Sequence, residues 1–314
     1  MSALQYNRKD FLKTLVGAGM ATALIKFPLS VVAQSENLST FTILHTNDWH
    51  SRIEPFPMDG GKYQGMGGAA YRAELIKQIR NETEHVLLLD SGDMFQGTPY
   101  YNFYGGELEF KLMSEMKYDC ATLGNHDFDG GIEGLKKQLP HASFSIINAN
   151  YDFSGTELKN TFEPYKIYTL GKIKVGVIGI GIDLQGLVPD NNRKGLVYND
   201  PIIAANNNAQ YLKENKGCDI VIVLSHLGYK YADDKVSDEV LAQKTKNIDL
   251  ILGGHTHTFM ETPVNTTNLD GETTIINQTG WGGIMLGRLD FTMVSGQVLK
   301  NPQSSMLKVS TKSI

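Results

Sequence analysis

The stretch Leu250-Ile251-Leu252-Gly253-Gly254-His255-Thr256-His257 joins a short apolar run to two glycines and a pair of histidines. The run is continuous rather than alternating, which is typical of a strand buried on both faces of a sheet. The glycines allow a tight turn directly after the strand. A buried strand that ends in a turn with potential ligands predicts an α/β sheet whose binding site lies at the strand ends.

The same order of elements continues on both sides of this stretch. Further apolar runs occupy residues 41–44, 86–89, 121–123, 144–147, 175–180, 220–224 and 273–276. Helical periodicity lies between several of them, for example in Tyr71, Leu75 and Ile79 and again in Leu108, Leu112 and Met116. Alternation of strands and helices predicts an α/β fold with a largely parallel sheet.

Polar side chains that can bind metal ions follow five of these runs. They are Asp48, His50, Asp93, Asn125, His126, His226, His255 and His257. Because the carboxyl ends of parallel strands meet at one edge of a sheet, we expect these side chains to converge. Nitrogen ligands from histidine and oxygen ligands from aspartate suit Zn, Mn or Fe(II). The set is too large for one tetrahedral ion and predicts two ions that share a bridging carboxylate.

Composition excludes several classes of protein. The 314 residues are 41% hydrophobic and 20% charged, which is ordinary for a globular chain and excludes a disordered or collagen-like one. The formal net charge of −5 lacks the basic excess of a protein that binds nucleic acid polymers. Cys120 and Cys218 each begin an apolar run, so we expect both to be small buried side chains rather than a disulfide framework.

The N-terminus is expected to be a targeting segment. Basic residues around Arg8, Lys9 and Lys13 precede an apolar stretch over 14–25, and small residues suited to cleavage end at Ala33. This pattern predicts a signal peptide over 1–33 and a mature domain over 34–314. Lys9 stands where a twin-arginine (Tat) signal has its second arginine, so the signal is Tat-like. Export to a bacterial periplasm or cell surface is the expectation, without a stable membrane span.

Four motifs resemble the calcineurin-like metallophosphoesterases, and most closely the metallophosphatase domain of 5′-nucleotidases. The motifs are His45-Thr46-Asn47-Asp48-Trp49-His50, Asp90-Ser91-Gly92-Asp93-Met94-Phe95-Gln96-Gly97-Thr98-Pro99, Thr122-Leu123-Gly124-Asn125-His126-Asp127-Phe128-Asp129 and Ile251-Leu252-Gly253-Gly254-His255-Thr256-His257. The phrase Asn277-Gln278-Thr279-Gly280-Trp281-Gly282 adds to the closer likeness. The resemblance covers residues from about 41 to 293 and implies a four-layer α/β/β/α sandwich with the site between its sheets.

The resemblance also implies roles for the site residues. One metal would be held by Asp48, His50, Asp93 and His257, and the other by Asp93, Asn125, His226 and His255. His126 would be the catalytic imidazole, oriented by Asp129. Two divalent ions would neutralise the phosphate and lower the pKa of bound water, and the resulting hydroxide would attack phosphorus in line with the leaving oxygen. The expected substrates are small phosphate monoesters, above all nucleotides.

Three residues beside the candidate ligands are expected to have supporting roles. Trp49 is expected to pack rather than to touch substrate, and His45 to lie in the core or to support the ligands. Asp127 is expected outside the ligand set, because the family accepts glutamate there. Glycines 176, 179 and 181 predict a closely packed strand rather than a dinucleotide-binding loop.

Two-domain 5′-nucleotidases have a further nucleotide-specificity domain, and we expect none in this chain, because residue 314 closely follows the phosphatase motifs. A separate chain could supply that domain, or the enzyme could be a broad phosphatase or a cyclic phosphodiesterase. A thiosulfohydrolase of sulfur oxidation shares this site and is a second enzymatic alternative. A catalytically idle surface-binding module is the alternative outside enzymes.

Overall fold

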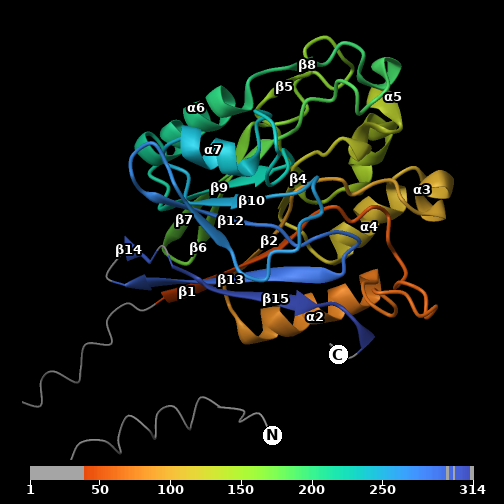
Figure 1. The fold of residues 1–314 in the computed structure, drawn as a ribbon, viewed down its shortest axis with the longest axis horizontal. Helices are drawn as coiled ribbons and strands as arrows, with labels where there is room; N and C mark the ends of the chain where they lie inside the picture. Colours follow the sequence, from red (N-terminus) through yellow and green to blue (C-terminus); the bar gives the residue numbers. More distant parts are fainter. Residues whose placement is uncertain (1–38, 295–296, 300, 312–314) are drawn as a thin grey trace, which may run out of the picture. The chain divides into compact units, whose positions relative to one another are not determined.

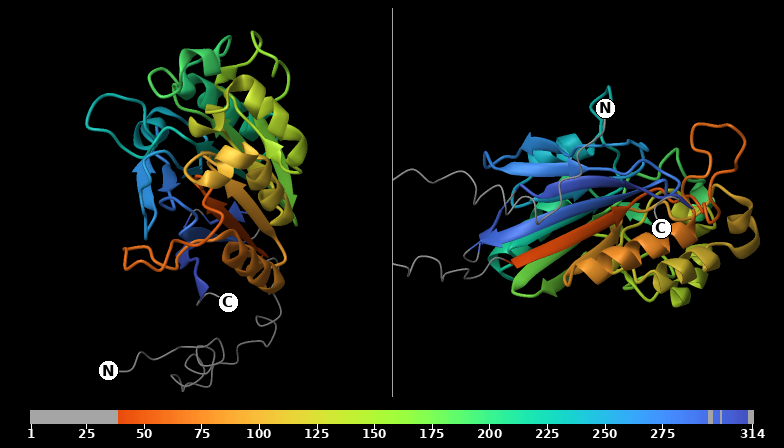
Figure 2. Two further views of the ribbon diagram at one scale, coloured as in Figure 1. Left: turned by 90° about the vertical axis from the view of Figure 1, so that its right-hand side faces the viewer. Right: turned by 90° about the horizontal axis from the view of Figure 1, so that it is seen from below.

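The structure, a computed structural model, describes residues 39–294, 297–299 and 301–311. The predicted signal peptide over 1–33 lies outside the described residues. In the described part, two β-sheets pack face to face and helices cover their outer faces (Figure 1). Figure 2 shows the same layers from the side and from below.

The first sheet has the strand order β14-β13-β1-β2-β3-β4, and β15 pairs with β13. Its strands are β1 (Ser39–Thr46), β2 (Val86–Asp90), β3 (Cys120–Ala121), β4 (Ser145–Ile146), β13 (Met285–Val294), β14 (Gln297–Val298) and β15 (Gln303–Lys308). Strands β1 to β4 are parallel, as the sequence predicts. Strand β13 runs antiparallel beside β1, with Phe41 opposite Phe291. The last part of the described chain therefore closes the sheet beside its first strand.

The second sheet has the order β11-β12-β10-β9-β7-β6. Its strands are β6 (Tyr165–Leu170), β7 (Ile173–Ile180), β9 (Ile220–Ser225), β10 (Leu250–Leu252), β11 (Val264–Thr267) and β12 (Thr273–Asn277). The four central strands are parallel, and β6 and β11 are antiparallel edges. A small ribbon of β5 (Tyr151–Asp152) and β8 (Val197–Tyr198) lies outside both sheets. The predicted parallel strands are thus divided between two sheets.

The helices segregate by sheet. On the first sheet lie α2 (Ala69–Glu82), α3 (Pro99–Tyr104), α4 (Glu107–Glu115) and α5 (Gly131–Gln138), and on the second lie α6 (Pro201–Glu214) and α7 (Asp238–Lys244). Short 3₁₀ turns are η2 (His126–Phe128), η3 (Leu139–His141) and η4 (Asp190–Arg193). Helix α6 begins at Pro201 because the Asp200 carboxylate accepts hydrogen bonds from the N–H groups of Ile202 and Ile203.

The buried apolar side chains form three clusters that match the four layers. One cluster packs Leu44 and Leu88 of the first sheet against Ile76 of α2. A second fills the space between the sheets, where Phe41 and Val177 belong to opposite layers. The third lies between the second sheet and helices α6 and α7. The predicted α/β/β/α sandwich is therefore confirmed.

Several local predictions are also confirmed. Cys120 and Cys218 are buried free thiols. In β7, a Cβ at Gly179 would lie 2.2 Å from the carbonyl oxygen of Ile147, so only glycine fits this close approach between strand and loop. Of the three periodic residues in helix α2, Ile79 is buried, and Tyr71 and Leu75 are half-buried and pack against the core. Arg72 and Ile76, which the pattern did not include, are also buried.

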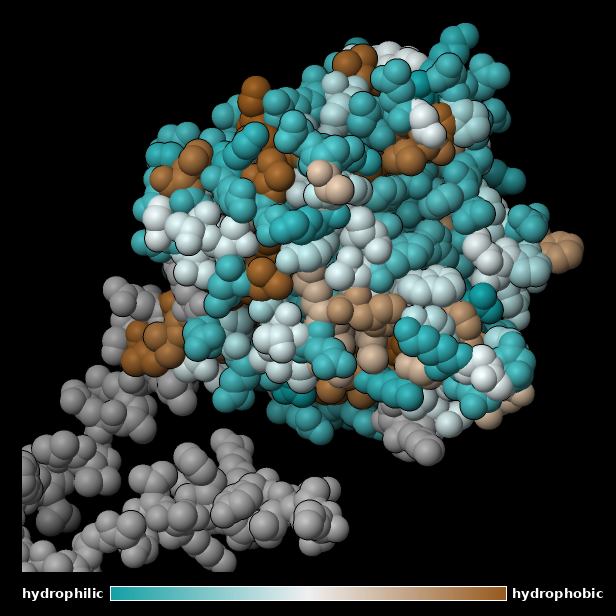
Figure 3. All heavy atoms as spheres, viewed as in Figure 1, coloured by the Kyte–Doolittle hydropathy of each residue, from teal (hydrophilic) through white to brown (hydrophobic). Residues whose placement is uncertain are grey.

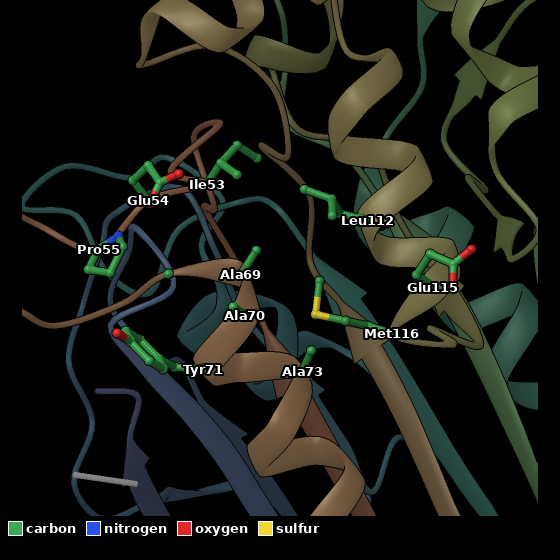
Figure 4. A pocket seen from close by; sticks show the side chains of 11 residues that line it. Ile53, Glu54, Pro55, Ala69, Ala70, Tyr71, Ala73, Leu112, Glu115 and Met116 are labelled. Carbon is green, nitrogen blue, oxygen red and sulfur yellow. The ribbon is translucent and has the colours of Figure 1, made fainter. Parts of the chain in front are cut away.

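The face seen in Figure 3 is mainly hydrophilic with scattered apolar side chains. A groove of about 380 Å³ lies where α2, α4 and the loop at Ile53 meet. Figure 4 shows Leu112 of α4, Met116 directly after α4, and the alanines of α2 lining this groove. The groove contains none of the predicted ligands.

No described helix is both long and apolar enough to cross a bilayer.

His45 is a core residue. Its side chain on β1 is fully buried, and neither ring nitrogen has a hydrogen-bond partner among the described residues. Burial lowers the pKa of His45 from 6.5 to about 3. The imidazole is therefore neutral in the folded protein at neutral pH.

Acidification should destabilise the fold through His45. Between pH 6.5 and about 3 the unfolded chain binds a proton at this residue and the folded chain does not. Stability therefore falls as the pH drops below 6.5, by up to about 1.4 kcal/mol per pH unit from this residue. Urea unfolding at about pH 7 and about pH 5 should show a smaller loss for His45→Leu than for wild type or a His141→Gln control. An equal loss in all three proteins would contradict this assignment.

Candidate metal centre

The seven predicted ligands come together between the two sheets. Each lies at or just beyond the carboxyl end of a strand: β1 is followed by Asp48 and His50, β2 by Asp93, β3 by Asn125, β9 by His226, and β10 by His255 and His257. Two groups of candidate ligands, each with its donor atoms within 4.8 Å of one another, can hold a metal ion. One contains Asp48, His50 and His257, and the other contains Asp93, His226 and His255.

The first group joins the end of β1 to the loop after β10. The Nε2 atoms of His50 and His257 are 2.9 Å apart. Asp48 Oδ1 lies 3.3 Å from His257 Nε2 and 3.7 Å from His50 Nε2. Asp48 is fixed from behind, because its carboxylate accepts the Asn47 Nδ2–H and the backbone N–H of His255. Three donor atoms from both sheets thus face one point.

The second group joins β2, β9 and β10. Asp93 Oδ2 lies 3.1 Å from His226 Nε2. Asn125 Oδ1 lies 2.9 Å from His255 Nδ1, which brings the predicted amide ligand to the same group. His226 and Asp93 are almost completely buried, whereas His255 is half-buried.

Asp93 lies between the two groups. Its Oδ2 is 3.1 Å from His226 Nε2 and 3.9 Å from His50 Nε2, so the same oxygen faces both groups. Its Oδ1 accepts the backbone N–H of His126 at 2.7 Å. This hydrogen bond leaves Oδ2 as the oxygen available to both groups.

The arrangement fits divalent cations. Two ligands at about 2.0–2.2 Å from one ion, separated by tetrahedral or octahedral angles, lie about 2.9–3.5 Å from each other. The closest donor pairs in both groups have such spacings. His226 Nδ1 lies 2.6 Å from the Ser91 carbonyl and can only donate there. Against the effect of burial, Asp93 raises the pKa of His226 to about 10, so without a cation Nε2 also carries a proton, 3.1 Å from the Asp93 carboxylate. A metal ion bound between these two groups would take the place of that proton.

The ligand loops have an unusual backbone. Asp48, His50, Asp93, His255 and His257 all have φ between 51° and 68°, the left-handed region that side chains other than glycine rarely adopt. Strain of this kind persists where the surrounding structure holds the site in shape. Gly124 permits the closest approach, since a Cβ there would lie 2.2 Å from Asp93 Oδ1.

Asp127 organises these loops without joining either group. Its buried carboxylate accepts the backbone N–H groups of Asp93, Met94, Phe95 and Gly124. Burial raises the pKa of Asp127 to about 7, and the N–H donors act in the opposite direction. Asp127 therefore fixes the loops after β2 and β3 against each other, a role that the sequence pattern alone does not indicate.

His126 and Asp129 form a pair at the open side of the centre. His126 Nδ1 lies 2.8 Å from Asp129 Oδ2, and the backbone carbonyl of Asp129 accepts the Asn192 side chain. The hydrogen bond to Asp129 raises the pKa of His126 above its usual value. The side chain of His126 is 34% exposed, and its ring centre is 5.2 Å from that of His50. His126 Nε2 is thus free to face a ligand at the metal groups.

Trp49 packs in the core as predicted, and only 1% of its surface is exposed. The guanidinium carbon of Arg72 lies 4.0 Å from the centre of its ring.

The ligand pattern did not indicate the residues that support the ligand loops. Asn47 Oδ1 accepts hydrogen bonds from Thr279, and its Nδ2 also donates to the Gly280 carbonyl. Asn47 belongs to the motif that starts at His45, and Thr279 and Gly280 belong to the phrase that starts at Asn277. The presence of both motifs in one sequence was the signal that could have indicated this contact.

The fold and the paired ligand groups define a metallophosphatase-type α/β sandwich. Residues 41–259 match the calcineurin-like phosphoesterase family, and the chain belongs to this family. The family that the sequence motifs indicated is therefore confirmed.

Relatives place the chain near the 5′-nucleotidases. It is 40% identical over 241 residues to a venom 5′-nucleotidase of Crotalus adamanteus, covering 74% of this chain and 39% of that one. A 5′-nucleotidase precursor from Thermus thermophilus superposes with a TM-score of 0.78 at 31% identity, covering 88% of this chain and 55% of that one. A sulfate thiohydrolase from Thermus thermophilus shares the fold, with a TM-score of 0.73 at 20% identity over 86% of this chain and 57% of that one. The chain thus spans about two fifths of the curated relative's length.

Proposed function

We propose that this chain is an exported dinuclear-metal phosphoesterase that hydrolyses phosphate monoesters, chiefly nucleotides. The observation that carries the proposal is the pair of ligand groups that face the same oxygen of Asp93. Likeness to the venom and bacterial 5′-nucleotidases supports nucleotides as the substrate class. The leader over 1–33 and a bacterial periplasmic or cell-surface location remain predictions from the sequence.

In this proposal one ion is held by Asp48, His50, Asp93 and His257. The second is held by Asp93, Asn125, His226 and His255. When bound, the two ions supply charge neutralisation for the phosphate and an activated water nucleophile. The chain's own residues keep the donors in place, through the left-handed loops and through the buried Asp127.

His126 is proposed to act on the leaving group. Its Nδ1 is engaged by Asp129, so a protonated ring carries its second proton on Nε2, on the side away from Asp129. The raised pKa keeps this proton available near neutral pH. Donation from Nε2 would neutralise the leaving oxygen as its bond to phosphorus breaks.

The alternatives differ in the ester rather than in the fold. The likeness to the sulfate thiohydrolase is below 25% identity and supports the fold alone. A separate chain with a nucleotide-specificity domain stays a prediction, as do a broad phosphatase, a cyclic phosphodiesterase and an idle surface module.

A substrate panel tests the proposal. With Mn or Zn added, the purified chain should hydrolyse AMP faster than p-nitrophenyl phosphate, a 2′,3′-cyclic nucleotide, UDP-glucose or a thiosulfate ester. EDTA should abolish the activity, and either metal should restore it, because the ions neutralise the phosphate. Equal rates on AMP and p-nitrophenyl phosphate would mean a broad phosphatase. No hydrolysis of any phosphate ester would reject the proposal.

A further inference from the structure

Four aromatic side chains form a row that starts at the candidate metal centre. They are Phe56 and Tyr63 from the loop between β1 and α2, Phe259 after β10, and Trp281 after β12; we call them the aromatic row. Trp281 stacks on the candidate ligand His257, with ring centres 5.6 Å apart and an interplanar angle of 11°. Phe56 and Tyr63 pack edge-to-face with Trp281, with ring centres 5.4 Å and 6.3 Å from its ring centre. Tyr63 then stacks with Phe259 at 6.0 Å.

Backbone hydrogen bonds also connect the aromatic row to the loops that carry the candidate metal ligands. The N–H of Gly282, next to Trp281, donates to the carbonyl of Asp48 at 2.7 Å. Phe259 follows His257 by two residues and pairs across a β-bridge with Thr279. A molecule bound at the metal groups therefore has these rings at a fixed distance.

The row is not part of the core. All four side chains are half-buried, whereas the other tryptophan, Trp49, is 1% exposed. A cavity of about 290 Å³ opens beside Tyr63 and Phe259, with Met285 and Met306 in its wall. The same cavity is lined by Lys62 and Glu261, which offer one cationic donor and one anionic acceptor.

We propose that the aromatic row and its cavity hold the base of a nucleotide whose phosphate lies at the metal centre; this inference rests on the proposed function. A flat heteroaromatic ring can stack on Tyr63 and Phe259 while its polar edge meets Lys62 and Glu261. The Arg52 guanidinium lies 4.3 Å from the Phe56 ring, and Lys62 Nζ lies 5.0 Å from the Tyr63 ring. These cations add positive charge where a nucleotide, which is anionic, would pass.

The test compares two phosphate esters that differ in the base. AMP and ribose 5-phosphate both release an alcohol from the same carbon, and only AMP carries a base. Tyr63→Ala should lower the ratio of kcat/KM for AMP to kcat/KM for ribose 5-phosphate by about 5- to 150-fold, since aromatic stacking of one base is of that size. Phe259→Ala should act in the same direction. The rings of Tyr63 and Phe259 contact each other, and Tyr63 contacts Trp281, but neither ring contacts the ring of a candidate ligand. The ratio therefore reports on the base.

Two further variants serve as controls. Tyr63→Phe keeps the ring and should restore most of the ratio. Met58→Ala removes a side chain in the same loop that is 78% exposed, and should leave the ratio at the wild-type value. An unchanged ratio in Tyr63→Ala and Phe259→Ala would overturn the proposal and leave the row as loop packing.

A binding readout separates this inference from the proposed function. The chain has two tryptophans, and only Trp281 adjoins the cavity residues, through Tyr63. AMP titrated into the full chain in EDTA should quench tryptophan fluorescence, and the apparent Kd should rise in Tyr63→Ala. Ribose 5-phosphate should not cause the same quench. If neither ester is hydrolysed with metal, the proposed function fails, whereas equal quenching by both compounds overturns the base site alone.

Discussion

Replacing Asp93 with asparagine should remove both metal ions and nearly all activity. The variant keeps an oxygen that can accept the His126 N–H, so the loop hydrogen bond seen at Oδ1 can persist. It loses the negative charge of the oxygen that faces both ligand groups. Because two ions contribute several kcal/mol to catalysis, we expect kcat/KM for p-nitrophenyl phosphate to fall by about 10³-fold or more.

Metal content is the decisive measurement for Asp93. Elemental analysis should find close to two ions per wild-type chain and far fewer in Asp93→Asn and Asp93→Ala. Asp270→Ala is a matched control, because it removes an exposed carboxylate whose partner is Lys246 on the surface. Unchanged metal stoichiometry in the Asp93 variants would contradict the bridging role, whatever happens to the rate.

The strands that carry the site were predictable because most of them are continuous apolar runs. Strands β2, β9 and β10 need no alternation when both of their faces are covered, and the sequence has none in their apolar parts. Their division into two sheets was not predictable from the runs alone. Nothing local in residues 41–44 distinguishes the strand that pairs with β13 from one that would pair with β9.

The missed elements have physical reasons. Strand β13 lies 239 positions after β1, counting from Met285 back to Thr46, and its pairing depends on the closure of the whole sheet. Helix α2 buries Arg72 rather than a fully apolar stripe, because the guanidinium packs over Trp49. Hydrophobic periodicity assigns a charged side chain to the surface, so the pattern in α2 did not indicate that Arg72 is buried.

The candidate ligands could be collected from the sequence, but their division into groups could not. His255 and His257 are two residues apart, yet they join different groups because the left-handed backbone at both residues turns their rings apart. Asp127, in contrast, is close to the candidate ligands in sequence but does not join them. It follows Asn125 and His126 directly along the chain, yet its carboxylate accepts hydrogen bonds from four backbone N–H groups instead.

His126→Ala should keep both metal ions and lower kcat by about 10²–10⁴-fold on AMP. Its ring is not a member of either ligand group, and its removal leaves the Asn125 amide in place. Asp129→Asn should give a smaller loss on the same substrate, because the asparagine can still hold the ring but supports its charged form less well. His141→Ala, a half-buried surface histidine, is the matched control.

The leaving group decides how His126 acts. The 5′-oxygen of AMP departs as a poor leaving group and needs a proton, whereas p-nitrophenolate is stable as an anion at neutral pH. If His126 Nε2 donates that proton, His126→Ala should therefore lose much more activity on AMP than on p-nitrophenyl phosphate. An equal loss on both esters would assign His126 to stabilising charge on the phosphate instead. Full activity of His126→Ala on AMP, with both metals present, would refute any catalytic role for the pair that His126 forms with Asp129.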